Sequence, residues 1–375
     1  MISTRLHGLI DYAVASLLGG LATSSSFPPP VRRVLGGASA YHLGYTPLTD
    51  FEAGVQARIN MRQHLALDAI GGAALIGAGL LMRRQPDRAR GLLIAAGMSE
   101  LAVVAFSSAT PVSGPGQGGG AVERLLGPAT EVSEQVSYQP LDTPKPVADD
   151  VFIVDSVLPG IVGKVIPVRM TLVRLPNGDL LLHSPTRFSL RLKEEVEQLG
   201  RIRHLVAPNF AHWMFLKDWQ DSCPEATTWA APGLRRRSQV RKSGVRLDHD
   251  LSGTAPPEWG GAVEQAMVPG GLGFREVAFF HRPTRTLVLT DLVMNLEAAK
   301  LPSVMRPLVR LFGLMAPDGM PLPYVRAIVK LRHAEAARAA SRLLDLRPER
   351  VIFAHGQWFE RDGAAALRRS FRWLV

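Results

Sequence analysis

Three short apolar runs in the second half of the chain each end at a residue that can bind a metal. The runs and their end residues are 205–209 with His212, 287–290 with Asp291, and 351–354 with His355. Runs of this length that are rich in β-branched and aromatic residues predict buried strands. Because the ends of neighbouring strands meet at one edge of a sheet, we expect the three polar side chains to meet there. This pattern predicts an α/β fold with a candidate site at a sheet edge.

The composition excludes several classes of protein. The chain has 375 residues, enough for one to three domains, and a formal net charge of +10. No aromatic and basic motif of the RNA-binding kind accompanies the positive charge, so we expect no nucleic-acid partner. The basic run at 235–242 is interpreted as a solvated loop. Cys223 is the only cysteine, which excludes an intrachain disulfide and is interpreted as a buried or incidental thiol.

The first third of the chain predicts membrane helices. It contains four apolar stretches, at 6–22, 31–48, 65–82 and 91–107. Each has roughly the 17–20 residues that cross a bilayer as a helix. The stretches are rich in glycine, alanine and leucine, as packed membrane helices are. We therefore expect an all-α transmembrane four-helix domain at residues 1–110, with the lipid bilayer as its partner and a multi-pass location in a bacterial inner membrane.

The arginines between these stretches leave the membrane orientation open. Arginine excess marks the cytoplasmic side of membrane proteins. The loops after the first and third stretches carry more arginines than the opposite side, which favours both ends of the four-helix domain outside. A basic second domain with one cysteine suits the inside equally well, so both orientations stay open.

The first and third stretches open with the same pair of residues. His7 precedes Asp11, and His64 precedes Asp68, by four positions each. This spacing puts both side chains of a pair on one helix face, where they can form a hydrogen bond that lowers the cost of burial. The second and fourth stretches add one histidine and one glutamate. Two alternatives stay open: the helices bind a metal, haem or protons, or the polar groups only link helices. The echo suggests a duplicated two-helix unit.

A spaced motif runs through the same region. It consists of Leu6-His7-Gly8, Asp11-Tyr12, Thr49-Asp50, Glu52, Gly54, Met61, His64-Leu65 and Asp68. On these residues the region resembles small bacterial membrane proteins of the SPW-repeat type. The Ser-Pro-Trp signature itself is absent, and the resemblance implies no known activity.

Residues 111–146 differ in composition from both neighbours. They are rich in glycine, proline and serine, with Pro144 and Pro146 near their end. Such composition predicts a flexible linker, with a helical turn or two at 121–126. The second domain is therefore expected at 147–375.

Turn signals divide the second domain into strands and helices. We expect strands at 170–175, 180–183, 202–207, 227–231, 276–280, 286–290 and 351–354, and helices at 190–200 and 333–344. The turn Pro176-Asn177-Gly178-Asp179 predicts a hairpin. The apolar segment 296–331 is expected to be helical. It covers the core of the domain, lies on an anionic membrane, or mediates a homo-oligomer contact, for which the membrane helices are the other candidate.

Five spaced motifs accompany this order of elements. They are Arg169-Met170-Thr171 with Val173-Arg174-Leu175, Leu182-His183-Ser184-Pro185, Val206-Ala207-Pro208-Asn209 with His212, Ala231-Pro232-Gly233-Leu234, and Phe280-His281-Arg282-Pro283 with Arg285-Thr286-Leu287. On these motifs the second domain resembles the family called domain of unknown function 4336, a branch of the metallo-β-lactamase superfamily. The resemblance implies an α/β sandwich in which Asp291 corresponds to the bridging aspartate and His355 to the terminal histidine. It supplies no established reaction.

The resemblance also indicates a reduced metal site. The positions where that superfamily carries most of its loop ligands are occupied by Pro208, Phe210, Ala211 and Trp213. We expect His212, Asp291 and His355 to hold one Zn2+, or Fe2+ or Mn2+, and no metal if the site is degenerate.

The surroundings of this site leave two functions open. His183 and His281 are additional candidates near the metal, and His281 is equally suited to fixing its hairpin turn. Ser184 beside His183 invites a nucleophile reading, but the glycines of a nucleophile elbow are absent and a structural turn is expected. The chain is then a membrane-anchored hydrolase with a mononuclear site, or a non-catalytic binding, sensing or scaffolding domain tethered to a membrane. Catalytic residues are not assigned.

Overall fold

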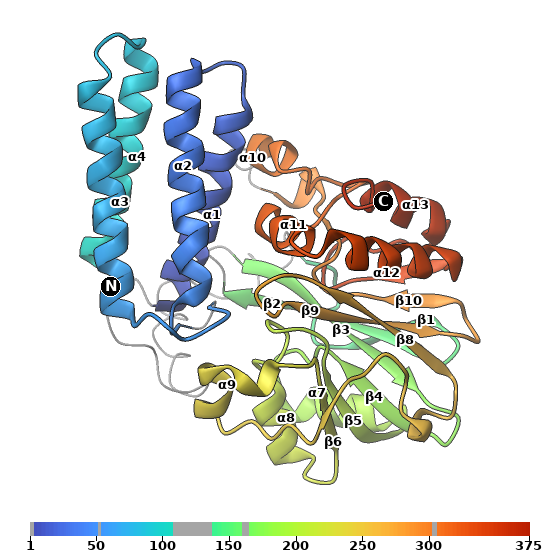
Figure 1. Ribbon diagram of the computed structural model, residues 1–375. Helices are drawn as coiled ribbons and strands as arrows, with labels where there is room; N and C mark the ends of the chain where they lie inside the picture. The colour runs from blue at the N-terminus through green and yellow to red at the C-terminus, as the bar shows by residue number, and fades with distance from the viewer. Residues whose placement is uncertain (1–3, 52–53, 108–136, 160–164, 302–305) are drawn as a thin grey trace. The chain divides into compact units, whose positions relative to one another are not determined.

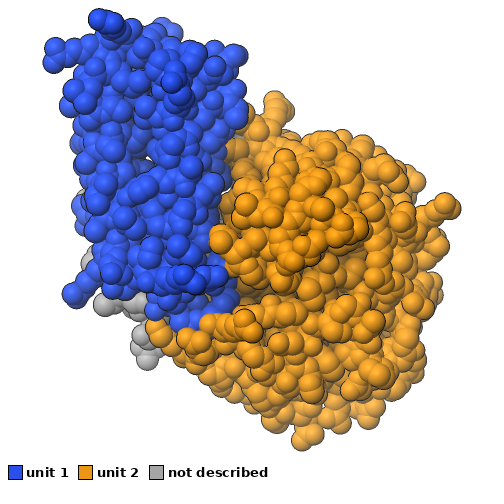
Figure 2. All heavy atoms as spheres, viewed as in Figure 1, with its two compact units in different colours: residues 1–114, 237–239 blue, residues 115–236, 240–375 orange. Residues whose placement is uncertain are grey.

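The computed structural model describes most of the chain. The described ranges are 4–51, 54–107, 137–159, 165–301 and 306–375. The chain divides into two compact units (Figure 2), residues 1–114 with 237–239 and residues 115–236 with 240–375. The predicted helical turn at 121–126 and most of the predicted linker lie outside the described residues.

The described residues of the first unit form four long helices. They are α1 (Thr4–Thr23), α2 (Pro29–Tyr45), α3 (Met61–Leu81) and α4 (Asp87–Phe106), with a short η1 (Thr46–Leu48) after α2 (Figure 1). Two local signals set their starts. α2 begins at a proline, whose fixed φ suits the first helical turn. α3 begins after a capping box, in which the side chains of Asn60 and Gln63 each accept from the other's backbone N–H.

The helices coincide with the four predicted spans, but α3 alone among the helices of the described residues is long and apolar enough to cross a membrane. α2 has 17 residues and begins with two arginines after its prolines. α4 begins with Asp87, Arg88 and Arg90 and carries Glu100 farther along. These charges shorten the apolar stretches of α2 and α4. A membrane role for α1, α2 and α4 stays a prediction.

The second unit is built on two main sheets. The first has seven strands in chain order, β1 (Pro144–Ala148), β2 (Val151–Pro159), β3 (Val165–Arg174), β4 (Asp179–His183), β5 (Arg201–Ala207), β6 (Thr227–Ala230) and β7 (His249–Asp250). The second has the order β12 (Arg350–Ile352), β10 (Thr286–Val288), β9 (Arg275–His281) and β8 (Val263–Pro269). β11 (Met294–Asn295) and β13 (His355–Gly356) form a parallel pair. The first sheet starts at Pro144, three residues before the predicted domain boundary.

The register confirms the predicted hairpins. β3 and β4 pair antiparallel with Thr171 opposite His183, and the turn between them uses Gly178 at φ +80°. β9 and β10 pair antiparallel with His281 opposite Thr286. β10 also pairs parallel with β12, so both of these strands end at the same edge of the sheet.

Two predicted helices of the second unit are shorter in the structure: the one at 190–200 ends at Glu197, and the one at 296–331 is interrupted. Among the described residues of this unit, the helices are α7 (Leu190–Glu197), α8 (Leu216–Ser222), α9 (Ser238–Lys242), α10 (Arg306–Leu311), α11 (Pro323–Lys330), α12 (His333–Asp345) and α13 (Gly363–Ser370), with η3 (Leu234–Arg236), η4 (Pro257–Trp259) and η5 (Ala298–Lys300). The prediction of one long helical segment at 296–331 is wrong. Gly313 at φ +68° and the prolines at 321 and 323 interrupt it. The basic run at 235–242, predicted as a loop, lies in η3 and α9.

Alternating side chains define the layers. In the first sheet, Leu172 and Leu182 face a core shared with α7 and α8, whereas Val173 and Leu181 face the second sheet. A period of two is what a strand buried on both faces requires.

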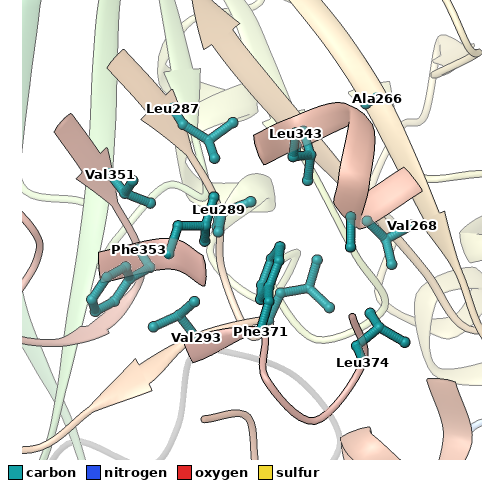
Figure 3. Close-up of a cluster of buried hydrophobic side chains, with 14 of the residues drawn as sticks. Ala266, Val268, Leu287, Leu289, Val293, Leu343, Val351, Phe353, Phe371 and Leu374 are labelled. Carbon is teal, nitrogen blue, oxygen red and sulfur yellow. The ribbon is translucent and has the colours of Figure 1, made fainter. Parts of the chain in front are cut away.

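The second sheet follows the same rule. Phe279 faces the first sheet, and Phe280 faces the core beneath α11, α12 and α13. Figure 3 shows this core, which includes Leu287 and Val351 of the sheet and Leu343 of α12. The unit is therefore a sandwich of two sheets with helices on both outer faces, the α/β architecture that the sequence predicted.

Candidate functional site

The three predicted strand ends meet. His212 lies in the loop after β5, Asp291 follows β10, and His355 opens β13. The Oδ1 atom of Asp291 is 3.2 Å from Nε2 of His212 and 3.3 Å from Nε2 of His355. The three side chains are 11%, 12% and 11% exposed, so the cluster reaches the surface.

Hydrogen bonds fix the orientation of both imidazole rings. Nδ1 of His355 lies 2.8 Å from the carbonyl oxygen of Pro167. A carbonyl only accepts, so Nδ1 carries a proton and donates it to Pro167, and Nε2 is the ring nitrogen turned toward Asp291. Nδ1 of His212 lies 2.6 Å from Oγ of Ser184, which has a left-handed backbone at φ +57°. Metal-binding histidines usually donate their second ring N–H in this way.

Asn209 connects two of the three residues and was not assigned a role from the sequence. Its Nδ2 donates to Oδ2 of Asp291 at 2.8 Å and to Oγ1 of Thr290 at 2.9 Å. Its Oδ1 accepts from the backbone N–H groups of Ala211 at 2.8 Å and His212 at 3.0 Å. Asn209 therefore holds the loop of His212 against the strand end of Asp291. The sequence signal was a polar amide at the end of a buried strand.

Glu276 on β9 is a second residue that sequence reasoning missed. Its side chain is fully buried and accepts from the backbone N–H groups of Thr290 at 2.8 Å, Asp291 at 2.9 Å and Leu292 at 3.3 Å. It thereby fixes the turn that presents Asp291. Burial and the charge of Asp291 raise the pKa of Glu276 above its ordinary value, against the effect of these N–H groups.

Charge interactions dominate the titration of the cluster. Burial raises the pKa of Asp291, but the charges and hydrogen bonds of His212 and His355 outweigh burial and hold that pKa well below its ordinary value. Burial lowers the pKa of His212, but Asp291 and then Glu276 outweigh it, and the net pKa is raised. The two acidic side chains thus make the cluster favourable for positive charge.

A buried arginine positions His355 from the first sheet. Nη1 of Arg169 donates to the carbonyl oxygens of Phe353 at 2.9 Å and Gly356 at 3.0 Å, and its Nη2 lies 2.6 Å from Oδ1 of Asp155. Gly356 has φ +89°, and a Cβ there would lie 2.1 Å from the carbonyl oxygen of Asn295. The turn that carries His355 therefore requires both the arginine and the glycine.

The two additional histidine candidates have structural surroundings. His183 is buried with its ring against Phe279, and burial together with the charge of His212 lowers its pKa to about 3. His281 has its Nδ1 2.8 Å from Oγ1 of Thr284, in the turn between β9 and β10. Because Asp291 follows the other end of β10, His281 lies away from the three-residue cluster and fixes the hairpin.

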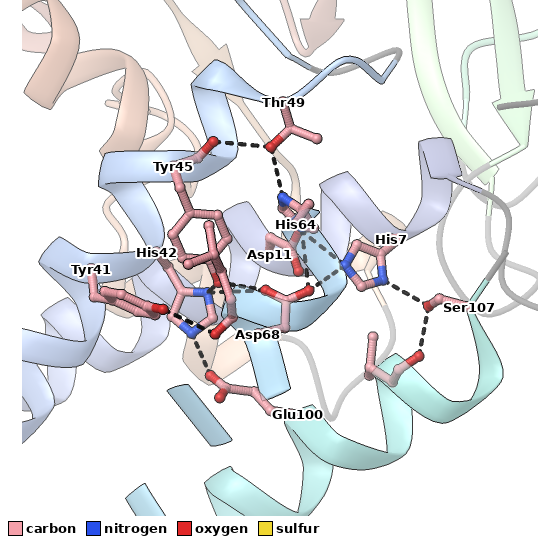
Figure 4. Close-up of polar contacts among 12 residues, drawn as sticks. His7, Asp11, Tyr41, His42, Tyr45, Thr49, His64, Asp68, Glu100 and Ser107 are labelled. Carbon is pink, nitrogen blue, oxygen red and sulfur yellow. Dashed lines mark hydrogen bonds and ion pairs between the residues drawn. The ribbon is translucent and has the colours of Figure 1, made fainter. Parts of the chain in front are cut away.

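The four paired residues of the helical unit also converge (Figure 4). Within each predicted pair, His7 and Asp11 are 3.4 Å apart and His64 and Asp68 are 3.3 Å apart. The shorter contacts cross between helices. Nε2 of His7 is 2.7 Å from Oδ2 of Asp68, and Nε2 of His64 is 2.7 Å from Oδ2 of Asp11. Each histidine therefore makes its shorter contact with the aspartate of the other helix, α1 or α3, and not with the aspartate of its own.

Comparisons with known proteins find a matching family model and several similar solved structures. The model of a family described as "Domain of unknown function (DUF4336)" matches residues 148–317. No curated protein matches the chain. Solved structures similar to it include a metallo-beta-lactamase from Pontibacter korlensis, at 14% identity and a TM-score of 0.44 over 62% of this chain and 97% of that one. A metallo-beta-lactamase from Hirschia baltica has 13% identity and a TM-score of 0.43 over 62% and 96%. The flavodiiron core Flv1 from Synechocystis has 14% identity and a TM-score of 0.46 over 62% and 60%.

Proposed function

We propose that the second unit binds one Zn2+, Fe2+ or Mn2+ ion through His212, Asp291 and His355 and acts as a hydrolase with a mononuclear site. The observation that carries the proposal is the convergence of two Nε2 atoms on one carboxylate oxygen, within 3.3 Å. The Nδ1 proton of His355 is committed to a carbonyl, so its Nε2 is free to bind a metal.

The donor set fits such an ion. Two imidazoles and one carboxylate form the protein part of many open zinc and iron sites. A metal held by three protein ligands keeps further positions open, where it would activate water for hydrolysis. The chain's own residues would orient the ligands: Ser184 and Pro167 fix the rings, and Asn209 holds the second oxygen of Asp291.

One observation favours the alternative of a non-catalytic binding domain. The loop that carries His212 packs apolar side chains into the cores. Trp213 is 8% exposed, and the ring of Phe210 packs against Phe274 with centroids 5.2 Å apart. Apart from His212, residues 208–213 carry no titratable side chain, so this loop offers a bound ion no general acid or base, as expected of a non-catalytic site.

Metal analysis of the purified full-length protein tests the metal site. We expect His355→Ala and Asp291→Asn to lose one equivalent of metal relative to the wild type. His333→Ala is the matched control, because His333 is exposed at the start of α12. Unchanged metal content in both site variants would refute the metal site. Stoichiometric metal without turnover of phosphate, ester or amide test substrates would favour the non-catalytic alternative.

We further propose that the helical unit anchors the chain in a bacterial inner membrane, with α3 as one span. Support comes from the length and composition of α3 and from its exposed apolar side chains, Ile70 at 60%, Leu80 at 54% and Leu81 at 82%. Fractionation tests this: an integral protein stays in the membrane pellet after an alkaline carbonate wash, and release of the chain would refute the anchor.

A further inference from the structure

The duplicated His-Asp pairs lie together at one end of the helical unit. α1 and α3 begin at this end, and α2 and α4 finish there, because successive helices run in opposite directions (Figure 1). The first eight residues of α1 supply His7 with Asp11, and the first eight of α3 supply His64 with Asp68. All four side chains are at least nine-tenths buried, and one donor atom from each lies within 4.8 Å of the others.

Two hydroxyl groups set the protonation of the two imidazoles. The hydroxyl of Thr49 donates to the carbonyl oxygen of Tyr45 at 3.0 Å, so its oxygen accepts from Nδ1 of His64 at 2.7 Å. The hydroxyl of Ser107 donates to the carbonyl oxygen of Val103 at 2.6 Å, so its oxygen accepts from Nδ1 of His7 at 2.7 Å. A hydroxyl has one proton to donate, so both rings carry a proton on Nδ1.

The Nε2 atoms of His7 and His64 then face atoms that, like themselves, carry lone pairs. With neutral rings, the lone pairs of both Nε2 atoms point at the Oδ2 atoms of Asp11 and Asp68, at the distances given above. Four electron-rich atoms in a buried place repel one another unless positive charge lies among them. That charge is either a second proton on each imidazole or one cation shared by all four.

We propose that His7, Asp11, His64 and Asp68 bind one divalent transition-metal ion, with Zn2+ the best fit. Zinc bonds of about 2.0–2.1 Å in a tetrahedron place neighbouring ligand atoms about 3.3 Å apart. Two of the four N–O distances are already 3.4 Å and 3.3 Å, and the two at 2.7 Å need to open by about 0.6 Å. The two carboxylates balance the charge of the ion, and the two hydroxyls hold the outer ring nitrogens as is usual around metals.

The surroundings indicate a closed site with a structural role. Phe51 is 1% exposed and packs its ring on His64, with centroids 5.4 Å apart. A Cβ at Gly8 would lie 1.7 Å from the Phe51 ring, so the glycine is what lets the ring cover α1 here. Tyr45 donates to the other oxygen of Asp68. Four protein ligands and no open position are typical of structural zinc. The ion would cross-link α1 to α3. This site lies in the helical unit and does not depend on the function proposed for the second unit.

A titration with Co2+ as a spectroscopic probe of zinc sites tests the proposal. It uses chelator-treated full-length protein carrying His355→Ala, so that the second unit contributes no metal. We expect one Co2+ per chain with the intense visible bands of tetrahedral coordination. Asp11→Asn and Asp68→Asn should each weaken binding by more than about a hundredfold, and the matched control Glu100→Gln, a buried carboxylate outside the four donors, should retain it.

Several results would overturn the proposal. One is the absence of Co2+ bands in the His355→Ala protein, a test that needs no change in the helical unit. Another is binding that Asp11→Asn and Asp68→Asn leave unchanged, which would show an adventitious ion only. The role of Thr49 is separable, because Thr49→Val should lower Co2+ affinity about 10–100-fold while Thr49→Ser restores it. Helical circular dichroism checks that each variant folds. Metal binding by the second unit is measured separately, in Asp11→Asn protein with His355 intact.

Discussion

Replacement of Asn209 by alanine tests the idea that one amide joins the two halves of the candidate site. The change removes the donor to Asp291 at 2.8 Å and the acceptor of the Ala211 and His212 N–H groups. A hydrogen bond to a charged group contributes about 1.5–3 kcal/mol and a neutral one about 1 kcal/mol. Allowing for partial relaxation, we expect the free energy of unfolding of the second unit to fall by about 3–5 kcal/mol.

The tryptophans make this measurable in the full-length chain. All 6 tryptophans lie at positions 213–373, outside the helical unit, so their fluorescence during urea unfolding reports the second unit alone. The matched control is Asn177→Ala, which removes an exposed amide bonded to Asp179 in the β3–β4 turn. We expect a loss below about 1 kcal/mol for the control. Equal losses in the two variants would refute the view that Asn209 joins the loop to the strand end.

Three further predictions concern the same unit and use the same fluorescence. Arg169→Met should cost about 3–5 kcal/mol, because it leaves Asp155 buried with Lys145 as its remaining ion-pair partner; a loss under about 1 kcal/mol would contradict the clamp. His183 has its pKa lowered to about 3, so between pH 6.5 and 3 the unfolded state takes up a proton that the folded state does not. The free energy of unfolding therefore decreases as the pH is lowered through this range, by up to about 1.4 kcal/mol per pH unit. His183→Phe should flatten this slope, and an unchanged slope would show that other groups cause it. Removal of metal by a chelator should lower the unfolding temperature of the wild type but not of Asp291→Asn, since an ion at a hundred times its Kd contributes about 2.7 kcal/mol; equal shifts in both proteins would place the ion elsewhere.

Much of the second unit could be predicted because buried strands correspond to short apolar runs in the sequence. Short apolar runs bounded by turn residues predicted the strands, and His212, Asp291 and His355 after three of them predicted where the strand ends meet. The structure adds the faces: Leu181 and Leu182 belong to different cores, and so do Phe279 and Phe280. Asn209 and Glu276 were missed because their partners, at Thr290 to Leu292, lie far along the chain. No local spacing encodes such contacts.

The helical unit shows a different limit. Helix periodicity correctly placed His7 with Asp11, and His64 with Asp68, on shared faces. It carries no information on how the helices are rotated against each other, and that rotation decides which aspartate each histidine meets. The segment 296–331 failed for a third reason: its apolar composition resembled a helix, but single residues such as Gly313 decide where a helix can continue.

The parallel pairing of β10 with β12 has a consequence during protein synthesis. Asp291 and Glu276 emerge from the ribosome well before Val351 and His355. Until the later residues are made, the two carboxyl groups lie together without the second histidine. One edge of β10 also lacks its partner strand β12. A chain that stops short of β12 therefore presents an open sheet edge beside apolar Leu287, a surface that chaperones and proteases recognise. Because the last ligand lies next to the last strand of that sheet, the site can assemble only after synthesis has passed His355.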